Sequence, residues 1–326
     1  MVSEADVTMA YRLLMGREPE DPRVVSAHAA ACGSLAELRA EFMSSAEFRG
    51  LMGDPGLFKG SSGVKPLTFP PIAVEIDVPA DILRRMVERI EGEFLYLGQH
   101  EPHWSVLTSD RYKADQIDQN EAEFFASGEQ SVNEFLLAAS RTGLDLSGFR
   151  SCFELGCGVG RLTLWLARHF DQVIGGDISE SHLEHARAAA SRAGQGNISF
   201  RLLNQIARYK DLPRFDVFFS LIVLQHNPPP LMAHLLDVIL TQLAPGGIAY
   251  FQIPTYKEDY SFAAQAYLDT PAQPGDIEVH CLPQDRLFSI FARTGCEVLE
   301  FREDGSVGTN AISNRVLLRK KAKPAR

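Results

Sequence analysis

The stretch FELGCGVGRLT, residues 153–163, holds glycines at three alternating positions, Gly156, Gly158 and Gly160. An apolar, strand-like run leads into these glycines, and an amphipathic, helix-like run follows them. Glycine lets the backbone turn sharply and come close to a ligand, so a strand-to-helix turn of this kind is suited to holding a nucleotide. The residues around the glycines indicate which nucleotide chemistry fits.

Two common nucleotide turns do not fit this stretch. A dinucleotide turn needs a third glycine or an alanine, and that position falls on Arg161 or Thr163, depending on the register. The turn also lacks the G-x-x-x-x-G-K-[ST] pattern of a P-loop. Glu154 instead places a carboxylate two residues before Gly156. A carboxylate there suits a cationic ligand and repels a pyrophosphate.

The resulting pattern, E-x-G-x-G-x-G, resembles the first motif of class I S-adenosylmethionine-dependent methyltransferases. The segments FDVFFSLIVLQHNPPP and LAPGGIAYF are similar to later parts of the same family, and the resemblance covers residues 124–320. It implies S-adenosyl-L-methionine as the cofactor and methyl transfer as the reaction. The cofactor-binding residues that it implies are Glu154, Gly156, Cys157, Gly158, Gly160, Asp177, Ile178, Asn204, Gln205 and Tyr112.

The resemblance gives several of these residues a role. Asp177, at the end of the second expected strand, would accept hydrogen bonds from the ribose hydroxyls, and Ile178 would pack on the adenine ring. Asn204 stands where the family commonly places an aspartate that contacts the adenine amino group, and its amide oxygen can still accept that bond. Tyr112 belongs to an aromatic loop that we expect to fold over the cofactor as a lid, together with a turn at residues 124–128.

Two histidines are the candidate catalytic residues. Methyl transfer is an in-line displacement at an activated sulfonium, so a general base is needed only for a hydroxyl or a protonated amine acceptor. His226, in the turn after the fourth expected strand, is either that base, a substrate contact, or a structural imidazole holding the turn. His280, in an insertion after the fifth strand, either forms part of a substrate wall or is a structural histidine.

Three other motifs are given structural interpretations. The run NPPP, residues 227–230, resembles the N-P-P-aromatic motif of some amino-methyltransferases, but Pro230 replaces the aromatic residue. A proline run that begins a helix explains it more simply. HLEH, residues 182–185, is one residue short of a zinc pattern, and HEPH, residues 100–103, also suggests metal ligands. We interpret HLEH as a solvated helix face and predict no metal site.

The chain around these motifs alternates strand and helix from residue 151 onward. Continuously apolar strands between helices are typical of a parallel sheet that is covered on both faces. No helix separates the last two strands, so we expect one of them to be antiparallel. The prediction is a Rossmann-like α/β fold with a seven-stranded, mostly parallel sheet. The expected strands are SCFELGC, QVIGGDIS, NISFRLL, FDVFFSLIVL, IAYFQIP, CEVLEFRED and NRVLLRKK.

Composition changes along the chain predict four parts. Residues 1–53 form an all-helical docking-type module, 54–79 a linker rich in glycine, proline and serine, 80–150 a helical cap or lid, and 151–326 the methyltransferase core. Within the module, LLMGREP and SSAEF resemble the small helical module related to phycobilisome linker domains. That module accompanies bacterial enzymes acting on surface glycans. It implies a protein partner for residues 1–53 and a sugar or glycan acceptor; the alternative is a helical cap that completes the core.

The overall composition narrows the location and the partners. The net charge of −10 over 326 residues disfavours a nucleic-acid substrate. Five cysteines without a C-x-x-C pair are typical of a reducing cytoplasm. No apolar run is long enough for a membrane span and no secretory signal is recognised, so we expect a cytoplasmic protein.

A second functional hypothesis is a non-catalytic, methyltransferase-like binding or docking protein. The intact glycine turn and Asp177 argue against it.

Overall fold

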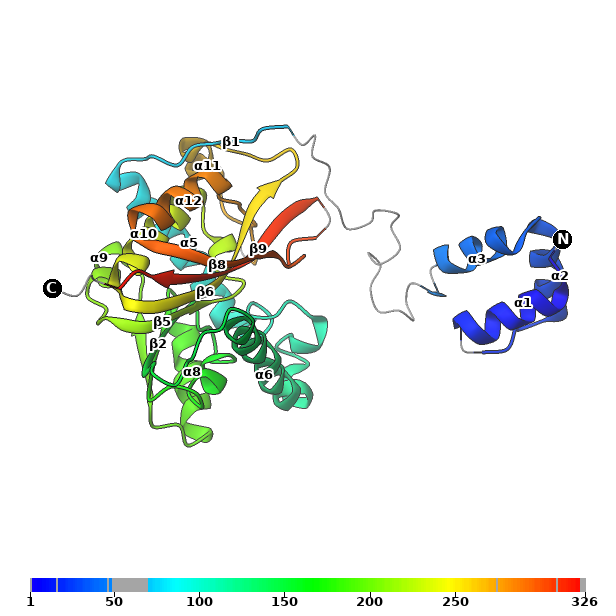
Figure 1. The fold of residues 1–326 in the computed structure, drawn as a ribbon, viewed down its shortest axis with the longest axis horizontal. Coiled ribbons are helices and arrows are strands. Elements are labelled where there is room, and N and C mark those ends of the chain that lie inside the picture. Colours follow the sequence, from blue (N-terminus) through cyan, green and yellow to red (C-terminus); the bar gives the residue numbers. More distant parts are fainter. Residues whose placement is uncertain are drawn as a thin grey trace. The chain divides into compact units, whose positions relative to one another are not determined.

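The computed structural model (Figure 1) describes residues 2–15, 17–45, 47–48, 70–273, 275–308 and 310–322. The chain divides into two compact units, Met1–Thr68 and Phe69–Arg326. Of the linker expected at residues 54–79, the part up to residue 69 lies outside the described residues.

The first unit is helical throughout its described elements. They are α1 (Glu4–Ala10), the π-helix η1 (Tyr11–Met15), α2 (Pro22–Ala31) and α3 (Leu35–Ser44). The Ser34 side chain caps α3, accepting a hydrogen bond from the Glu37 amide at 3.2 Å. The Glu37 carboxylate accepts from the amide of Gly33 at 2.7 Å. The unit has its own core, formed by Val2, Val7, Tyr11, Met15, Val25, Cys32, Leu38, Phe42 and Phe48.

The second unit is built on the predicted seven-stranded sheet. The strand order is β4-β3-β2-β5-β6-β9-β8. Neighbouring strands are parallel except that β9 runs antiparallel to both β6 and β8, which confirms the expected antiparallel strand. The bounds are β2 (Ser151–Leu155), β3 (Gln172–Asp177), β4 (Ile198–Leu202), β5 (Phe215–Ser220), β6 (Leu243–Lys257), β8 (Cys296–Glu303) and β9 (Ala311–Lys320).

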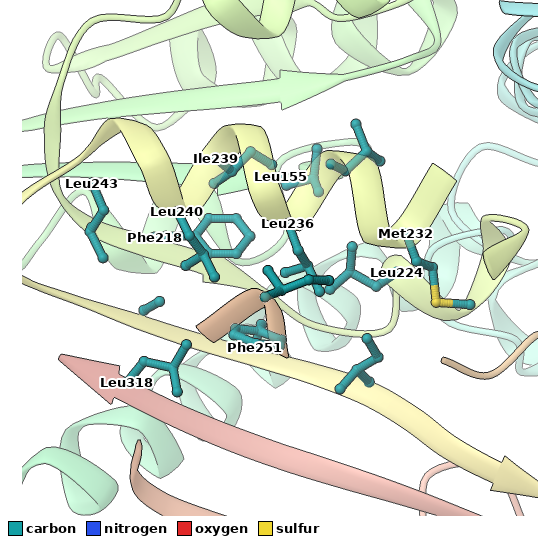
Figure 2. Packing of buried hydrophobic residues seen from close by; sticks show 14 of the residues in the cluster. Leu155, Phe218, Leu224, Met232, Leu236, Ile239, Leu240, Leu243, Phe251 and Leu318 are labelled. Atoms are coloured by element: carbon teal, nitrogen blue, oxygen red, sulfur yellow. The ribbon is translucent and has the colours of Figure 1, made fainter. Parts of the chain in front are cut away.

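Helices cover both faces of this sheet, as the apolar strands predict. The consecutive residues Phe218 and Phe219 of β5 point to opposite faces, because strand side chains alternate. Figure 2 shows Leu236 and Leu240 of α10 gathered with Phe218 on one face. On the other face, Phe135 of α6 lies 5.7 Å from Phe219 between ring centroids. The helices are α5 (Ala80–His100), η2 (Asp110–Tyr112), α6 (Ile117–Arg141), α7 (Thr163–Leu166), α8 (Glu180–Arg192), α9 (Ile206–Lys210), η3 (Leu224–His226), α10 (Pro229–Gln242), α11 (Ala264–Asp269) and α12 (Gln284–Arg293).

Several element bounds differ from the sequence prediction. The fourth expected strand ends at Ser220 instead of residue 224, since Ile222 takes a positive φ of 59° that breaks the extended chain. Residues 124–128, expected as a turn, lie inside α6. The helix expected after the glycine turn is reduced to α7. Within the expected linker, β1 (Ala73–Val74) pairs with β7 (Ser261–Phe262).

The described helices include none that is both long and apolar enough to cross a membrane.

Candidate functional site

A cavity opens where the carboxyl ends of β2, β3 and β5 meet, the edge where open α/β sheets bind ligands. The empty space at this edge amounts to about 820 Å³, a figure that includes open solvent. Its lining residues are Ile90, Phe94, Ser105, Val106, Glu154, Leu155, Gly156, Cys157, Gly158, Arg161, Leu162, Asp177, Ile178, His182, Tyr209, Leu221, Ile222, Val223, His226, Asn227 and Leu235.

The glycine turn forms the floor of this cavity. Gly156 and Gly158 have φ values of +71° and +52°, a region that side chains disfavour. A Cβ on Gly156 would lie 2.3 Å from the Val223 side chain, and one on Gly158 would lie 2.5 Å from that of Val106. Gly160 also has a positive φ, +89°, but it does not line the cavity. The turn therefore needs glycine for its backbone and for the close approach of two neighbouring segments.

Asp177 joins the glycine turn to the end of β3. One carboxylate oxygen accepts a hydrogen bond from the Gly158 amide at 2.8 Å, and the other accepts from the Ser179 amide at 2.9 Å. The side chain is 6% exposed and lines the cavity. A carboxylate oxygen accepts more than one hydrogen bond, so both oxygens keep capacity for a ligand hydroxyl.

Glu154 and Arg161 both place ionisable side chains at the wall of the cavity. Glu154 is 2% exposed, and burial raises its pKa to about 8, although its hydrogen bond with Thr163 (2.6 Å) and the nearby Arg161 oppose that rise. Burial lowers the pKa of Arg161, and Glu154 opposes that change. One guanidinium nitrogen of Arg161 donates to Ser127 Oγ at 3.1 Å, while its Nε finds no hydrogen-bond partner in the described part of the chain. Such a buried, unsatisfied donor is suited to an anionic ligand group.

His226 lines the cavity from η3. Its Nδ1 lies 2.9 Å from the carbonyl oxygen of Glu278, so Nδ1 carries the proton of the neutral ring. Nε2 lies 3.3 Å from Nε2 of Gln225, a long hydrogen bond that Gln225 donates. Burial is the largest cause that lowers the pKa of His226, to about 4, and the ring is neutral at pH 7. The single lone pair of Nε2 therefore accepts this long hydrogen bond from Gln225.

His280, the other predicted catalytic histidine, does not line the cavity. It is 5% exposed; its Nδ1 accepts a hydrogen bond from the Tyr260 hydroxyl at 2.8 Å, and its Nε2 lies 3.1 Å from a Glu278 carboxylate oxygen. Its backbone amide donates to the Gln225 carbonyl at 2.8 Å. His280 thus holds the insertion against η3. The residue that it contacts, Gln225, directly precedes His226 in the sequence.

The remaining predicted cofactor residues divide into two groups. Cys157 and Ile178 line the cavity, and burial raises the pKa of the Cys157 thiol. Tyr112, Asn204 and Gln205 do not line it. Tyr112 is 5% exposed and packs edge-on against Phe124. Asn204 donates to Glu91, and its buried Oδ1 has no hydrogen-bond partner among the residues that the structure describes. Gln205 is exposed, directly before α9. Their roles in cofactor binding stay predictions.

The structure corrects the interpretation of HLEH as a solvated helix face. His185 is exposed, but His182 is 2% exposed, lines the cavity, and has its Nε2 2.8 Å from Ser105 Oγ. His182 lies four residues before the buried Ala186, so helical periodicity could have revealed it.

His103 of HEPH is buried too, with its ring edge-on against Phe124. Within the described ranges, no group of three or more His, Cys, Asp or Glu side chains is placed to hold a metal ion.

The loop between α5 and η2 supplies lining residues that the sequence analysis did not single out. Ser105 and Val106 of this loop, with Phe94 of α5, close one side of the cavity. They come from a region expected to form a lid, but their positions follow from tertiary packing and no local motif marks them.

Comparison with known proteins identifies the domain around the glycine turn. Residues 153–247 match the family model described as "Methyltransferase domain". A ubiquinone biosynthesis O-methyltransferase of Coxiella burnetii is 33% identical over 120 residues, 37% of this chain and 50% of that protein. A 23S rRNA (uracil(747)-C(5))-methyltransferase of Vibrio vulnificus is 34% identical over 102 residues, 31% of this chain and 26% of that protein. The chain thus spans about half the length, or less, of these curated relatives.

Among solved structures, magnesium protoporphyrin IX methyltransferase from Synechocystis PCC 6803 aligns with a TM-score of 0.49 at 18% identity, covering 71% of this chain and 98% of the other. The family match confirms a methyltransferase domain at residues 153–247. The predicted likeness of residues 11–49 to phycobilisome-linker modules stays a prediction.

Proposed function

We propose that the protein is an S-adenosylmethionine-dependent methyltransferase that methylates a hydroxyl group of a small-molecule or sugar acceptor. The observation that carries this proposal is the convergence of Glu154, Arg161 and Asp177 in one cavity beside the glycine turn. The Glu154 carboxyl, the Arg161 guanidinium and a separate carboxylate match a ligand with a zwitterionic amino acid at one end and a ribose diol at the other. A bound ammonium group would favour the charged form of Glu154.

Different lining residues would bind different parts of the cofactor. Arg161, whose Nε has no partner within the described part of the chain, would bind the α-carboxylate, and Glu154 would face the α-ammonium. Asp177 would accept from the ribose hydroxyls, with Ile178 against the adenine ring. When bound, the cofactor supplies an activated sulfonium methyl group. The chain contributes orientation and the exclusion of water, which the apolar lining residues provide.

His226 is the proposed general base for a hydroxyl acceptor. Its Nδ1–H is fixed on the Glu278 carbonyl, so Nε2 is the ring atom that would take a proton once its long hydrogen bond from Gln225 (3.3 Å) is released. The ring is neutral at pH 7 because burial lowers its pKa. The O-methyltransferase relatives support a hydroxyl acceptor, and the net charge of −10 favours a small molecule over RNA.

A sugar or surface glycan remains the proposed acceptor class, and residues 1–53 the proposed docking site for a protein partner. Both rest on the resemblance of the N-terminal module. Mass spectrometry of glycans and sugar nucleotides from cells with and without the protein checks the acceptor. Loss of one methyl mass from a sugar is the expected result, and an unchanged sugar profile beside a lost methyl on another metabolite rejects the sugar.

Calorimetric titration with S-adenosylmethionine and S-adenosylhomocysteine tests the cofactor proposal. The wild-type protein should bind both, and Gly158→Arg should abolish binding because its side chain would project at Val106 across the cavity floor. Gly143→Arg is the matched control, since Gly143 also has a positive φ, +72°, but faces open space away from the cavity. Absence of binding of either nucleotide to the wild type would refute the proposal.

A further inference from the structure

One residue of the cavity wall has a backbone conformation that its side chain disfavours. Ile222 has a φ of +59°, in the left-handed region, where the branched Cβ of isoleucine crowds the neighbouring backbone. In the described part of the chain, Asp259 is the one other non-glycine residue with a positive φ, +56°. Asp259 is exposed in the turn between β6 and β7, and aspartate tolerates this region. Ile222 is therefore the strained position, and it lines the cavity.

The strained residue changes which face of the sheet the chain packs on. Along β5, Phe218 packs in the core cluster of one face and Phe219 in that of the other, as strand side chains alternate. An extended chain would place the side chain of Ile222 on the Phe218 face. Leu221 and Ile222 instead both pack with the cluster that contains Phe219, and Val223 packs with the other cluster. The positive φ thus holds Ile222 on one face and sends Val223 to the opposite face.

Packing in the core accounts for only part of this residue. Ile222 is half-buried, whereas its neighbour Leu221 is 7% exposed in the same cluster. A half-buried side chain gains only part of the transfer free energy of a core residue. Glycine would adopt the same φ without strain and would leave Leu221 in the core. Strained residues that a fold retains cluster at sites where ligands bind, and this one stands at the cavity.

The wall that carries Ile222 differs in chemistry from the wall that would hold the cofactor. The ionisable residues proposed to bind the cofactor come from β2, the glycine turn and β3, and they are Glu154, Arg161 and Asp177. The lining residues of the segment after β5 carry no charge at pH 7, and they are Leu221, Ile222, Val223, His226 and Asn227. This second wall includes the proposed general base. A methyl acceptor has to lie between the cofactor and that base, so it lies against the segment after β5.

We propose that Ile222 is a specificity-determining residue, whose side chain is the apolar support on which the methyl acceptor rests with its hydroxyl group toward His226. The inference rests on the proposed function and deepens it. Methyl transfer requires the acceptor oxygen in line with the methyl carbon and the sulfur, and small displacements slow it strongly. A β-branched side chain has few χ1 rotamers, so it fixes one side of the acceptor. The acceptor presents carbon–hydrogen bonds to Ile222 and no charged group, because a charge there would be buried without a partner.

Two substitutions separate the strain from the side chain. Ile222→Gly removes both, whereas Ile222→Ala removes the side chain beyond Cβ and keeps an L residue at a positive φ. Glycine is usually less stable than alanine, since its unfolded chain has more freedom. At residue 222 we expect the reverse order, with a higher urea midpoint for Ile222→Gly than for Ile222→Ala. Asp259 is the matched control, and Asp259→Gly should likewise exceed Asp259→Ala because its φ is also positive.

Methyl transfer measures the role of the side chain. S-adenosylmethionine with a tritiated methyl group is incubated with each variant and an extract of cells that lack the protein, which supplies the unmethylated acceptor. Ile222→Gly and Ile222→Ala should both lower the initial rate of label transfer by about tenfold or more, while Ile222→Val, which keeps the branched Cβ, stays close to the wild-type rate. Calorimetry should give an affinity for S-adenosylhomocysteine within about twofold of the wild type in every variant. Asp259→Gly should change neither the rate nor the affinity.

Three results would overturn the inference. A wild-type rate of transfer in Ile222→Gly would mean that the side chain supports no acceptor. A loss of S-adenosylhomocysteine affinity as large as the loss of rate would mean that Ile222 serves the cofactor instead. A urea midpoint of Ile222→Ala at or above that of Ile222→Gly would remove the strain from which the inference starts. Absence of label transfer by the wild type refutes the proposed function itself, so the two proposals fail in different measurements.

Discussion

At the scale of single residues, Arg161 explains both what the cavity excludes and what it binds. Its position is one where a dinucleotide turn needs glycine or alanine for close helix packing. Here the side chain is 8% exposed and lines the same cavity as Glu154, and its Nε has no hydrogen-bond partner in the ranges that the structure describes. The residue that rules out a pyrophosphate site thus supplies the charge for a carboxylate site.

Arg161→Leu should weaken S-adenosylmethionine binding by roughly 10- to 100-fold, because one charge-assisted hydrogen bond contributes about 1.5–3 kcal/mol. Calorimetry measures this directly. Methylthioadenosine provides the control, since it keeps the adenosine and lacks the amino acid. Its affinity should be the same for the variant and the wild type, and an equal loss for both ligands would place Arg161 away from the carboxylate.

At the scale of elements, the cavity depends on segments far apart in sequence. The sequence predicted the glycine turn and Asp177, because a strand followed by glycines and an acidic strand end are local patterns. It did not reveal Val106 or Val223, which touch the glycines only in the folded chain. The two cavity histidines differ in the same way. His226 was recognised because it follows a strand in the sequence, whereas the burial of His182 depends on a distant loop, the one that carries Ser105.

The contact between the glycine turn and the segment after β5 can be measured by a double-mutant cycle. Gly156→Ala should lower the free energy of unfolding by about 2–4 kcal/mol, through backbone strain at φ +71° and a clash with Val223. Val223→Ala should relieve the clash in part, because it removes the two γ carbons at 2.3 and 2.4 Å and leaves the Cβ at 2.9 Å. We expect a coupling of about 1 kcal/mol in urea unfolding.

Gly160→Ala is the control for this cycle. Gly160 has a positive φ, +89°, but the nearest atom to an added Cβ is 3.6 Å away, an ordinary contact. Val223→Ala should therefore not rescue it. A cycle in which Val223→Ala is additive with Gly156→Ala as well would contradict the close approach.

At the scale of the whole molecule, the sheet architecture was predictable because the pattern of strands and helices along the sequence determines which strands run parallel. Apolar strands with helices between them predict a covered parallel sheet, and the missing helix between the last two strands predicts the antiparallel β9. Residues 80–150 were harder to interpret. α6 covers a face of the sheet through Phe135 and Val132, while the loop ahead of it closes the cavity. One stretch thus serves both the core and the site, and no composition change separates the two roles.

Removal of residues 1–53 tests the division of the chain into two units. All lining residues of the cavity fall between Ile90 and Leu235, inside the unit Phe69–Arg326, and the first unit has a core of its own. We expect the truncated chain to bind S-adenosylmethionine with an affinity within about twofold of the full chain, because no cavity residue or core residue of the second unit is lost. Calorimetry with both chains, and thermal unfolding with and without the nucleotide, measures the effect. If the first unit serves docking, methyl transfer to a soluble acceptor survives the truncation while recruitment in cells is lost. A truncated chain that folds but no longer binds the nucleotide would mean that residues 1–53 complete the site.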